Sequence, residues 1–355
     1  MTLLFLNIEP FREGRIMKFR YLGLSLCFWL SLHATAFAQE FYKGKTVRII
    51  VGGTAGGGFD VYSRAMARHM GKHIPGNPTL IVENMTGAAT RIAAKYMHSA
   101  AKPDGLTFGI FNGYLILGRL LGMKGLDFDV REFEYIGVPV QDNVACALTK
   151  ASGITNLEQW YAAKRPVKIG GLGPGNSLSD VPRVLNAALG LPIQIVEGYK
   201  GSADVRLAAD SGEVDGGCWA WESVKVTWAN GLQSGNVNVI IQATAKAQLD
   251  LPKVPVALEV AKTDEARQLI KAGVLAPSSI TRVYVTMPGT PKDRVQILRK
   301  AFADTLRDPE FVAEAKKSKL TIDPLTGEEV EKMVTELFAT SPSTVSKLAA
   351  VLAVK

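Results

Sequence analysis

Two glycine-rich turns hold the residues most suited to chemistry in this chain. One turn spans 52–58 (GGTAGGG) and the other spans 170–175 (GGLGPG), and each follows a short apolar run and precedes a helical pattern. Glycine lets a ligand approach the backbone because no Cβ stands in the way. The amino end of a helix adds unpaired N–H groups and a partial positive charge. The pattern therefore predicts an anion site in each half of the chain, suited to a carboxylate, a phosphate or a sulfate.

Two further turns, 84–90 and 199–202, come after equivalent short strands. In open α/β sheets, ligands bind outside the carboxyl ends of the strands. Four such turns facing one another would form a cleft lined with hydrogen-bond donors. Each turn taken singly is equally compatible with a simple reversal of the chain.

Nucleotide and metal sites are not expected. No Gly-Lys-Ser/Thr follows the first turn, and its glycines lack the spacing of a dinucleotide fingerprint. His69 and His73 have the i, i+4 spacing of a metal pair, but Gly71 interrupts the helix and no glutamate lies between them as a base. We interpret both as surface histidines, and predict no metal and no cofactor.

Catalytic motifs are equally sparse. The run 175–179 (GNSLS) has serine where a nucleophile elbow requires glycine, and neither Cys146 nor Cys218 has a histidine nearby in the sequence. Trp219 and Glu222 follow a strand exit, where an aromatic wall and an acid can select a ligand, although such a tryptophan is also typical of a core. The residues predict a protein without catalytic activity.

Composition sets the class of protein. The 355 residues are 47% hydrophobic and 21% charged, with 34 glycines and 17 prolines, which excludes disordered, collagenous and coiled-coil chains and favours two compact lobes. The formal net charge is +8, yet the basic residues are scattered and are not interleaved with aromatics. Nucleic acid is therefore not an expected partner.

The first 38 residues predict a cleaved signal peptide. A basic start at 17–20 (MKFR) precedes the apolar stretch 21–32, and Ala36-Phe37-Ala38 gives the small-x-small cleavage pattern before Gln39. Translation is expected to begin at Met17. A lipoprotein attached at Cys27 is disfavoured by the bulky Leu26 before it. Export to the periplasm leaves Cys146 and Cys218, which either form one disulfide or remain two separate buried thiols.

Short strands and helices alternate along the mature chain, which predicts βαβ units and a mostly parallel sheet in each lobe. We place lobe 1 at 39–138 plus 240–355 and lobe 2 at 139–239, with the first crossing at Val138-Pro139 and a ligand cleft between the lobes. Strands are expected at 46–51, 79–82, 107–111, 144–149, 167–169, 193–196, 214–218, 237–242 and 281–286. Helices are expected at 60–70, 88–98, 177–189, 203–211, 264–272, 291–307, 309–317 and 327–338.

A set of segments spread in order along the chain resembles the extracytoplasmic solute receptors of tripartite tricarboxylate transporters, the TctC or Bug family. The matching segments are 41–51 (FYKGKTVRIIV), 55–64 (AGGGFDVYSR), 81–88 (IVENMTGA), 102–105 (KPDG), 171–175 (GLGPG), 199–201 (YKG) and 288–291 (PGTP). Two departures stand out: Gly87 is followed by Ala88-Ala89-Thr90, and the stretch 251–280 is longer than the commonest family pattern.

The resemblance implies a type II periplasmic-binding-protein fold, with two α/β lobes and a hinge crossed twice. It implies that one ligand carboxylate is held largely by backbone N–H groups and ordered waters. The donors would come from turns 54–58 and 84–89 on one lobe and from turn 173–177 on the other.

The sequence thus predicts a periplasmic receptor that captures a small organic carboxylate and docks, as a monomer, on a membrane permease. The alternatives are an exported Rossmann-like enzyme and a ligand-sensing receptor for a membrane kinase. Side chains such as Phe111, Tyr114, Tyr199, Trp219 and Glu222 would select the remainder of the ligand. The full set of expected binding residues is Thr54, Ala55, Gly56, Gly57, Gly58, Asp60, Asn84, Gly87, Ala88, Phe111, Asn112, Tyr114, Gly173, Gly175, Asn176, Ser177, Tyr199, Lys200, Trp219 and Glu222.

Overall fold

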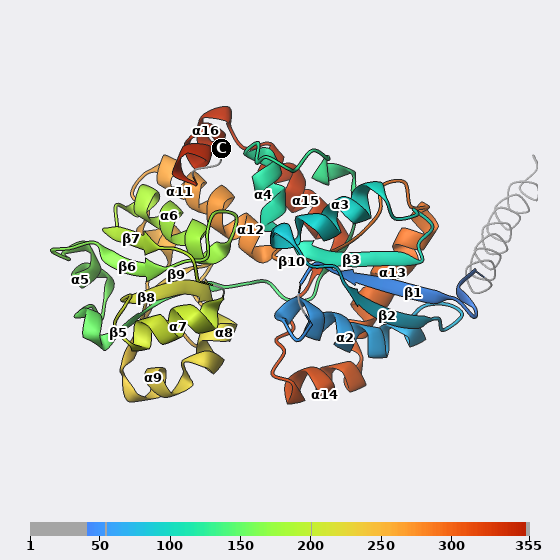
Figure 1. Ribbon diagram of the computed structural model, residues 1–355, viewed down its shortest axis with the longest axis horizontal. Helices are drawn as coiled ribbons and strands as arrows, with labels where there is room; N and C mark the ends of the chain where they lie inside the picture. The colour runs from blue at the N-terminus through green and yellow to red at the C-terminus, as the bar shows by residue number, and fades with distance from the viewer. Residues whose placement is uncertain (1–40, 54, 200, 353–355) are drawn as a thin grey trace, which may run out of the picture.

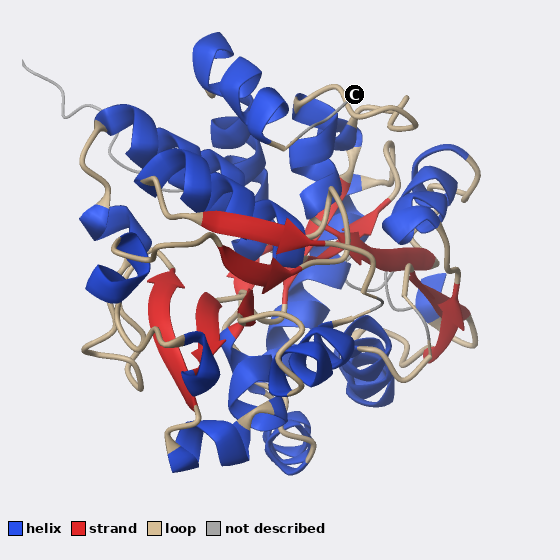
Figure 2. Ribbon diagram, turned by 60° about the vertical axis from the view of Figure 1, so that its left-hand side comes forward, coloured by secondary structure: helices blue, strands red, loops and turns tan. Residues whose placement is uncertain are grey.

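Two lobes, each built on its own sheet, make up the computed structural model, which describes residues 41–352 apart from 54 and 200 (Figure 1). Helices flank the strands of each sheet on both sides (Figure 2). The expected α/β fold with two lobes is confirmed. The predicted signal peptide at 1–38 lies outside the described residues.

The first sheet has six strands in the order β11-β4-β10-β3-β1-β2. β1 pairs in parallel with β2 and β3, whereas β10 is antiparallel to both β3 and β4. The sheet is therefore mixed and not mostly parallel, because β10 enters it from the opposite direction on returning from the other lobe. The strands are β1 (Thr46–Val51), β2 (Thr79–Asn84), β3 (Thr107–Asn112), β4 (Glu134–Val138), β10 (Arg282–Thr286) and β11 (Leu325–Thr326).

The helices of the first lobe pack on this sheet or on one another; α2 and α3, for example, contact its strands, whereas α14 packs on α2 and α13. In α2, Tyr62, Ala65, Met66 and Met70 are buried, at the spacing of a single helix face. The helices are α2 (Gly58–Met70), α3 (Arg91–Ser99), α4 (Tyr114–Leu120), α13 (Lys292–Arg307), α14 (Pro309–Lys317) and α15 (Gly327–Phe338). Single 3-10 turns occupy Gly71–His73, Ala88–Thr90 and Val130–Glu132.

The second sheet has five strands in the order β7-β6-β8-β5-β9. β6 is parallel to β7 and β8, and β5 is antiparallel to β8 and β9. The strands are β5 (Val144–Thr149), β6 (Val167–Gly170), β7 (Ile193–Val196), β8 (Gly216–Ala220) and β9 (Val237–Ala243). Its helices are α5 (Leu157–Tyr161), α6 (Ser177–Leu189), α7 (Ser202–Asp210), α8 (Trp221–Thr227), α9 (Ala229–Ser234), α10 (Ala257–Val260) and α11 (Asp264–Ile270), with a 3-10 turn at Lys150–Ser152.

A disulfide joins the two cysteines of this sheet. Cys146 on β5 and Cys218 on β8 are direct cross-strand partners, and their Cα atoms are 4.0 Å apart. Both side chains are fully buried. Of the two alternatives left open by the sequence, the structure therefore shows the disulfide.

The chain crosses between the lobes twice. The first crossing lies between the end of β4 at Val138 and the start of β5 at Val144. The second crossing lies later than residue 240, because β9 still pairs with β5 as far as Ala243 and α11 packs against α6. The chain returns through a π-helical turn (Lys271–Leu275) and α12 (Ala276–Ser279), and it re-enters the first sheet only at β10. The stretch 240–270 therefore belongs with lobe 2.

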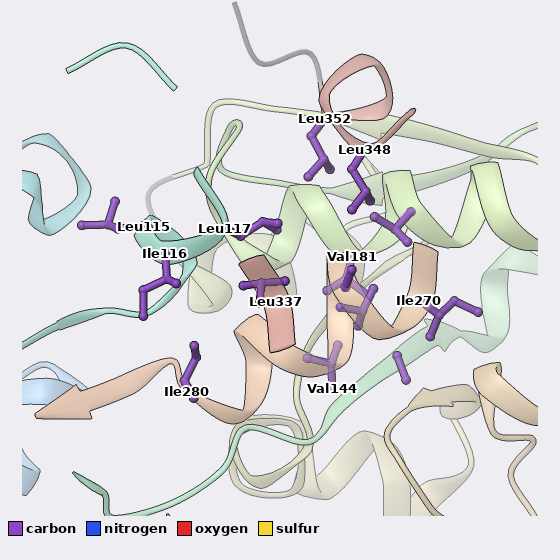
Figure 3. Close-up of a cluster of buried hydrophobic side chains, with 14 of the residues drawn as sticks. Leu115, Ile116, Leu117, Val144, Val181, Ile270, Ile280, Leu337, Leu348 and Leu352 are labelled. Atoms are coloured by element: carbon purple, nitrogen blue, oxygen red, sulfur yellow. The ribbon is translucent and has the colours of Figure 1, made fainter. Parts of the chain in front are cut away.

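The last helices bridge both lobes. α15 packs against β4 and α4 of the first lobe, whereas α16 (Pro342–Val351) packs against α6 and α11 of the second. One apolar cluster runs continuously through this seam, with Leu117 of α4, Val181 of α6, Leu337 of α15 and Leu348 of α16 among its members (Figure 3). Within the described part of the chain, no helix has both the length and the apolarity needed to cross a membrane.

Candidate functional site

The carboxyl edge of the first sheet brings together two of the predicted turns and a third that follows β3. β1, β2 and β3 run parallel, so the turns that follow Val51, Asn84 and Asn112 leave the sheet at the same edge. The turns are also tied together, since the amide of Asn112 donates to Thr90 Oγ1 at 3.0 Å. This is the edge at which α/β sheets bind ligands.

Backbone conformations that L-residues rarely adopt cluster at this edge. Gly87 has φ of 130°, and the next residues include Ala88 at 47° and Thr90 at 74°. Positive φ in a non-glycine residue costs energy and is common at binding sites. The turn 87–90 is therefore held in a costly conformation beside the first glycine turn.

Asp60 holds the first glycine turn in place by hydrogen bonds. Its buried carboxylate accepts hydrogen bonds from Gly56 N at 2.8 Å, from Arg64 Nε at 2.8 Å and from Asn84 Nδ2 at 3.0 Å. The Arg64 hydrogen bond is the main reason that the pKa of Asp60 falls to about 2. Asn84 Nδ2 also donates to the carbonyl of Gly53 at 2.9 Å. Asp60 and Asn84 thus shape the turn, and the Gly56 amide is already occupied.

The second lobe repeats this arrangement at the start of α6. Gly175 N donates to Asp180 Oδ2 at 2.9 Å, and Gly173 N donates to Ser179 Oγ at 2.8 Å. Asn176 caps the helix by accepting from Leu178 N. The amides of both glycines are therefore satisfied within the turn, and the amides of Leu178, Ser179 and Asp180 donate to Asn176. Among the described residues, this leaves Gly58 N at the start of α2 and Ser177 N at the start of α6 as amide donors without an acceptor.

Asp180 differs from Asp60 in its electrostatics. Burial raises the pKa of Asp180 to about 7, even though Arg183 and the Gly175 amide favour the charged form. Arg183 Nη1 lies 3.4 Å from Asp180 Oδ1 and the same guanidinium also binds Glu197, so it neutralises Asp180 only partly.

Replacing Asp180 with Asn is expected to stabilise the protein more at pH 8 than at pH 5.5. With a folded pKa of about 7, the folded state keeps this proton in a range where the unfolded chain has released it. The contribution of this group to stability is therefore complete below about pH 4 and is lost as the pH rises through 7. Thermal unfolding of both proteins at the two pH values measures the difference. Asp60→Asn is the matched control, because Asp60 is ionised throughout this range; an equal effect of Asp180→Asn at both pH values would contradict the expectation.

Three of the side chains expected to select a ligand are buried in the lobes. Phe111 packs on Phe133 with ring centroids 5.3 Å apart, and Trp219 packs on Trp228 at 5.1 Å. Tyr114 is also buried, and its hydroxyl lies 2.9 Å from Ser278 Oγ. In this conformation the three side chains belong to the hydrophobic cores of the lobes.

The remaining predicted residues are placed as follows. Tyr199 donates to Glu213 Oε1 at 2.6 Å, and burial together with this bond raises its pKa to about 12. Asn112 Oδ1 accepts from Tyr114 N. Ala55 and Gly57 belong to the exposed or half-exposed first turn, and Thr54 and Lys200 lie outside the described residues.

Glu222 makes a contact between the lobes. It lies in the first turn of the second lobe's α8, and its Oε2 accepts from Thr321 Oγ1 of the first lobe at 3.2 Å and from Lys225 Nζ at 2.8 Å. The Thr321 carbonyl in turn accepts from the Tyr62 hydroxyl of α2 at 2.8 Å. The second glycine turn also approaches the first lobe, since a Cβ at Gly175 would lie 3.2 Å from Met123 Cε.

A hollow of about 450 Å³ lies beside the two crossings. Its lining mixes polar and apolar residues and includes Asp142, Asn143 and Ser278 from the two crossing segments. The glycine turns do not line it. It therefore marks the hinge side of the molecule and not the predicted anion site.

The two histidines of α2 and the turn after it are more enclosed than expected. His69 Nε2 lies 2.8 Å from Glu314 Oε2 on α14, and His73 Nε2 lies 2.8 Å from Asp308 Oδ2. Lys72 Nζ sits between Asp308 and Glu310, at 2.7 and 2.6 Å, and supplies a positive charge there. The histidines therefore hold α2 to α14, and they are half-buried side chains at a helix interface.

The sequence interpretation missed Arg282 and Asp142. Arg282 opens β10, an otherwise apolar strand, and forms an ion pair with Asp142 in the first crossing. The one sequence signal for this residue was a single charged side chain at the start of a buried strand. Which sheet edge it reaches depends on the antiparallel direction of β10, which the local pattern does not contain.

The fold is that of a two-lobed solute-binding protein of the periplasmic-binding-protein class. Comparison with known families places the chain within that class. The family model for tripartite tricarboxylate transporter family receptors, TctC, matches residues 62–348. The chain belongs to this family, and the resemblance seen in the sequence is confirmed.

Sequence identity to the following relatives is low. A UPF0065 protein of Bordetella bronchiseptica is 23% identical over 287 residues, covering 79% of this chain and 78% of that protein. Among solved structures, a TctC solute-binding protein from Polaromonas, without ligand, superposes with a TM-score of 0.66 at 19% identity, covering 86% of this chain and 99% of that chain. These matches support the fold.

Two further structural neighbours were solved with dicarboxylates. MatC from Rhodopseudomonas palustris, with bound malate, has a TM-score of 0.60 at 19% identity and covers 87% of this chain and 99% of its own. A second R. palustris protein, solved with adipate, has a TM-score of 0.63 at 20% identity and covers 87% of this chain and 98% of its own.

Proposed function

We propose that this protein is a periplasmic receptor that captures a small organic carboxylate between its lobes and presents it to the permease of a tripartite tricarboxylate-type transporter. The observation that carries the proposal is the pair of braced glycine turns, one in each lobe of a TctC-family chain, each leading into the amino end of a 13-residue helix. The helix start after each turn offers an amide without an acceptor and the positive end of a helix dipole to an anion.

The bracing explains why such a site suits a receptor. Asp60 and Asp180 hold their turns from within, so the amides at the two helix starts, Gly58 N of α2 and Ser177 N of α6, are already oriented before a ligand arrives. Preorganised donors cost less ordering entropy on binding. The binding of malate and adipate by structural neighbours fits a ligand with one or more carboxylates.

The same proposal covers location, partners and chemistry. The leader at 1–38 would direct export and be removed, and the protein would act as a monomer without a cofactor. It would bind and release its ligand unchanged, because transport receptors perform no reaction on their cargo.

A carboxylate is expected to raise the melting temperature of the mature protein. At a hundredfold excess over Kd, binding adds roughly 2.7 kcal/mol to the free energy of unfolding, or about 4 °C for a chain of this size. The screen should include malate, adipate, citrate, aromatic acids and amino acids, each paired with its neutral amide or ester as the control. The proposal predicts shifts with acids alone; equal shifts with neutral analogues, or none with any acid, would overturn it.

A further inference from the structure

Arg282 lies at the carboxyl edge of the first sheet, beside the first glycine turn. Because β10 is antiparallel to β3, its first residue is the cross-strand partner of Asn112, the last residue of β3. The guanidinium group packs over the ring of Tyr62 at 5.5 Å. A Cβ built on Gly58 would lie 3.7 Å from Arg282 Nη2, which places the guanidinium against the amino end of α2.

The hydrogen-bonding capacity of this guanidinium is largely unused. An arginine has five N–H donors, yet among the described residues Arg282 donates only through Nη1, to Asp142 Oδ1. Its Nε is shielded from solvent and has no acceptor there. The side chain is only 19% exposed. A buried donor without an acceptor is costly, and more so on a charged group.

Two other arginines of this molecule bind a carboxylate through the edge that is unused in Arg282. Arg48 holds Glu83 through Nε and Nη2, and Arg131 holds Asp129 through the same two atoms. Such side-on pairs give two parallel charge-assisted hydrogen bonds to a planar carboxylate. In Arg282 this edge has no acceptor among the described residues and adjoins the positive end of α2. The Asp60 carboxylate in that first turn of α2 accepts from Gly56, Arg64 and Asn84 and not from Arg282.

Asp142 does not fill that role. Its carboxylate occupies Nη1, on the other side of the guanidinium, and its amide donates to the Ser278 carbonyl at 3.2 Å, which fixes it to both crossings. Asp142 therefore balances the charge of Arg282 from the hinge side and leaves Nε and Nη2 unpaired among the described residues, with Nη2 beside Gly58 of the glycine turn.

We propose that Arg282 is a specificity-determining residue that binds a carboxylate of the ligand through Nε and Nη2, together with the Gly58 amide at the start of α2. This inference rests on the proposed function and adds a charged side chain to recognition by backbone amides. The ligand anion would complete the hydrogen bonding of a buried cation. A neutral amide in the same position would not compensate its charge, so Arg282 would separate acids from their amides.

The test measures calorimetric binding of malate and adipate, each alongside its diamide, to wild-type protein, Arg282→Gln, Arg282→Lys and Asp142→Asn. Arg282→Gln should weaken binding of the acid by about 10- to 100-fold, the range for a lost charge-assisted hydrogen-bond pair, and should reduce the preference for acid over diamide. The affinity of Arg282→Lys for the acid should fall between those of wild type and Arg282→Gln, because lysine keeps the charge without the planar edge of the guanidinium. Asp142→Asn should bind the acid as tightly as wild type or more tightly, since a competing anion is removed.

Arg131→Gln, which removes a surface arginine of the same lobe, is the matched control and should bind like wild type. A structural role for the Arg282–Asp142 pair would instead make Asp142→Asn lose as much affinity as Arg282→Gln, and this result would overturn the inference. Arg282→Gln binding within threefold of wild type would also overturn it. If wild type binds neither acid nor any other carboxylate of the thermal screen, the proposed function itself fails, and the inference fails with it.

Discussion

Removing the Cys146–Cys218 disulfide is expected to lower the free energy of unfolding by about 4 kcal/mol, the chain-entropy value for a loop of this length. The bond spans 72 residues and ties β5 to β8 around most of the second sheet. For a chain of this size the loss corresponds to roughly 7 °C in melting temperature. Denaturant unfolding of the oxidised wild type and of the double variant Cys146→Ala/Cys218→Ala measures it.

The single variants serve as the control for this experiment. Each breaks the same bond, so either single variant should lose nearly as much stability as the double variant, and their effects should not add. A double variant within about 1 kcal/mol of wild type would show that the second lobe does not depend on the bond. Reducing agent should destabilise wild type and leave the double variant unchanged.

Replacing Asp60 with Ala is expected to cost about 3 kcal/mol of stability and to weaken carboxylate binding at least tenfold. The change removes a buried acceptor that serves Gly56 N, Arg64 Nε and Asn84 Nδ2. Donors left without an acceptor carry the full desolvation cost. Without this brace the first glycine turn is no longer held before the ligand arrives, so binding must supply the ordering entropy.

Asp60→Asn separates the two effects, because its amide oxygen can still accept from Gly56 N. It should retain most of the ligand affinity while losing the ionic bond to Arg64. Since the pKa of Asp60 is lowered to about 2, its contribution to stability is present above about pH 4 and is lost as the pH falls toward 2. Calorimetric titration and thermal unfolding of both variants provide the readouts; an Asp60→Ala protein that binds carboxylates like wild type would contradict the bracing role.

Local patterns predicted those elements whose signals are local. The strand 46–51 and the helix 177–189 appear with the predicted bounds, because a β-branched run and an amphipathic period specify them without reference to the rest of the chain. α4 and β4 were not predicted. Nearly all residues of both are buried, so neither shows the alternation of apolar and polar faces on which such predictions depend.

Lobe boundaries and strand directions required tertiary information. Nothing in the run 237–243 indicates that it pairs with β5, and the direction of β10 depends on the path taken through α11 and α12. The position of Arg282 beside Gly58 depends on that direction. This explains why a residue so close to the first glycine turn was not among those predicted.

The glycine turns were located correctly, but the use of their amides was not predictable. Spacing alone cannot show that the N–H groups of Gly56, Gly173 and Gly175 have internal acceptors. The acceptors Asp60, Ser179 and Asp180 lie four to six residues further along, inside the helices. A carboxylate in the first turn of a helix that follows a glycine turn is therefore a useful sign of bracing.

The apolar seam through α4, α6, α15 and α16 also limits how the lobes can move. Since packed side chains there belong to both lobes, any relative motion is a rotation that pivots near this seam. In such a rotation the distance between the lobes changes little close to the pivot and most on the side remote from it. The hydrogen bond from Thr321 to Glu222 links the two lobes away from the seam residues. Such a rotation would therefore break this hydrogen bond first.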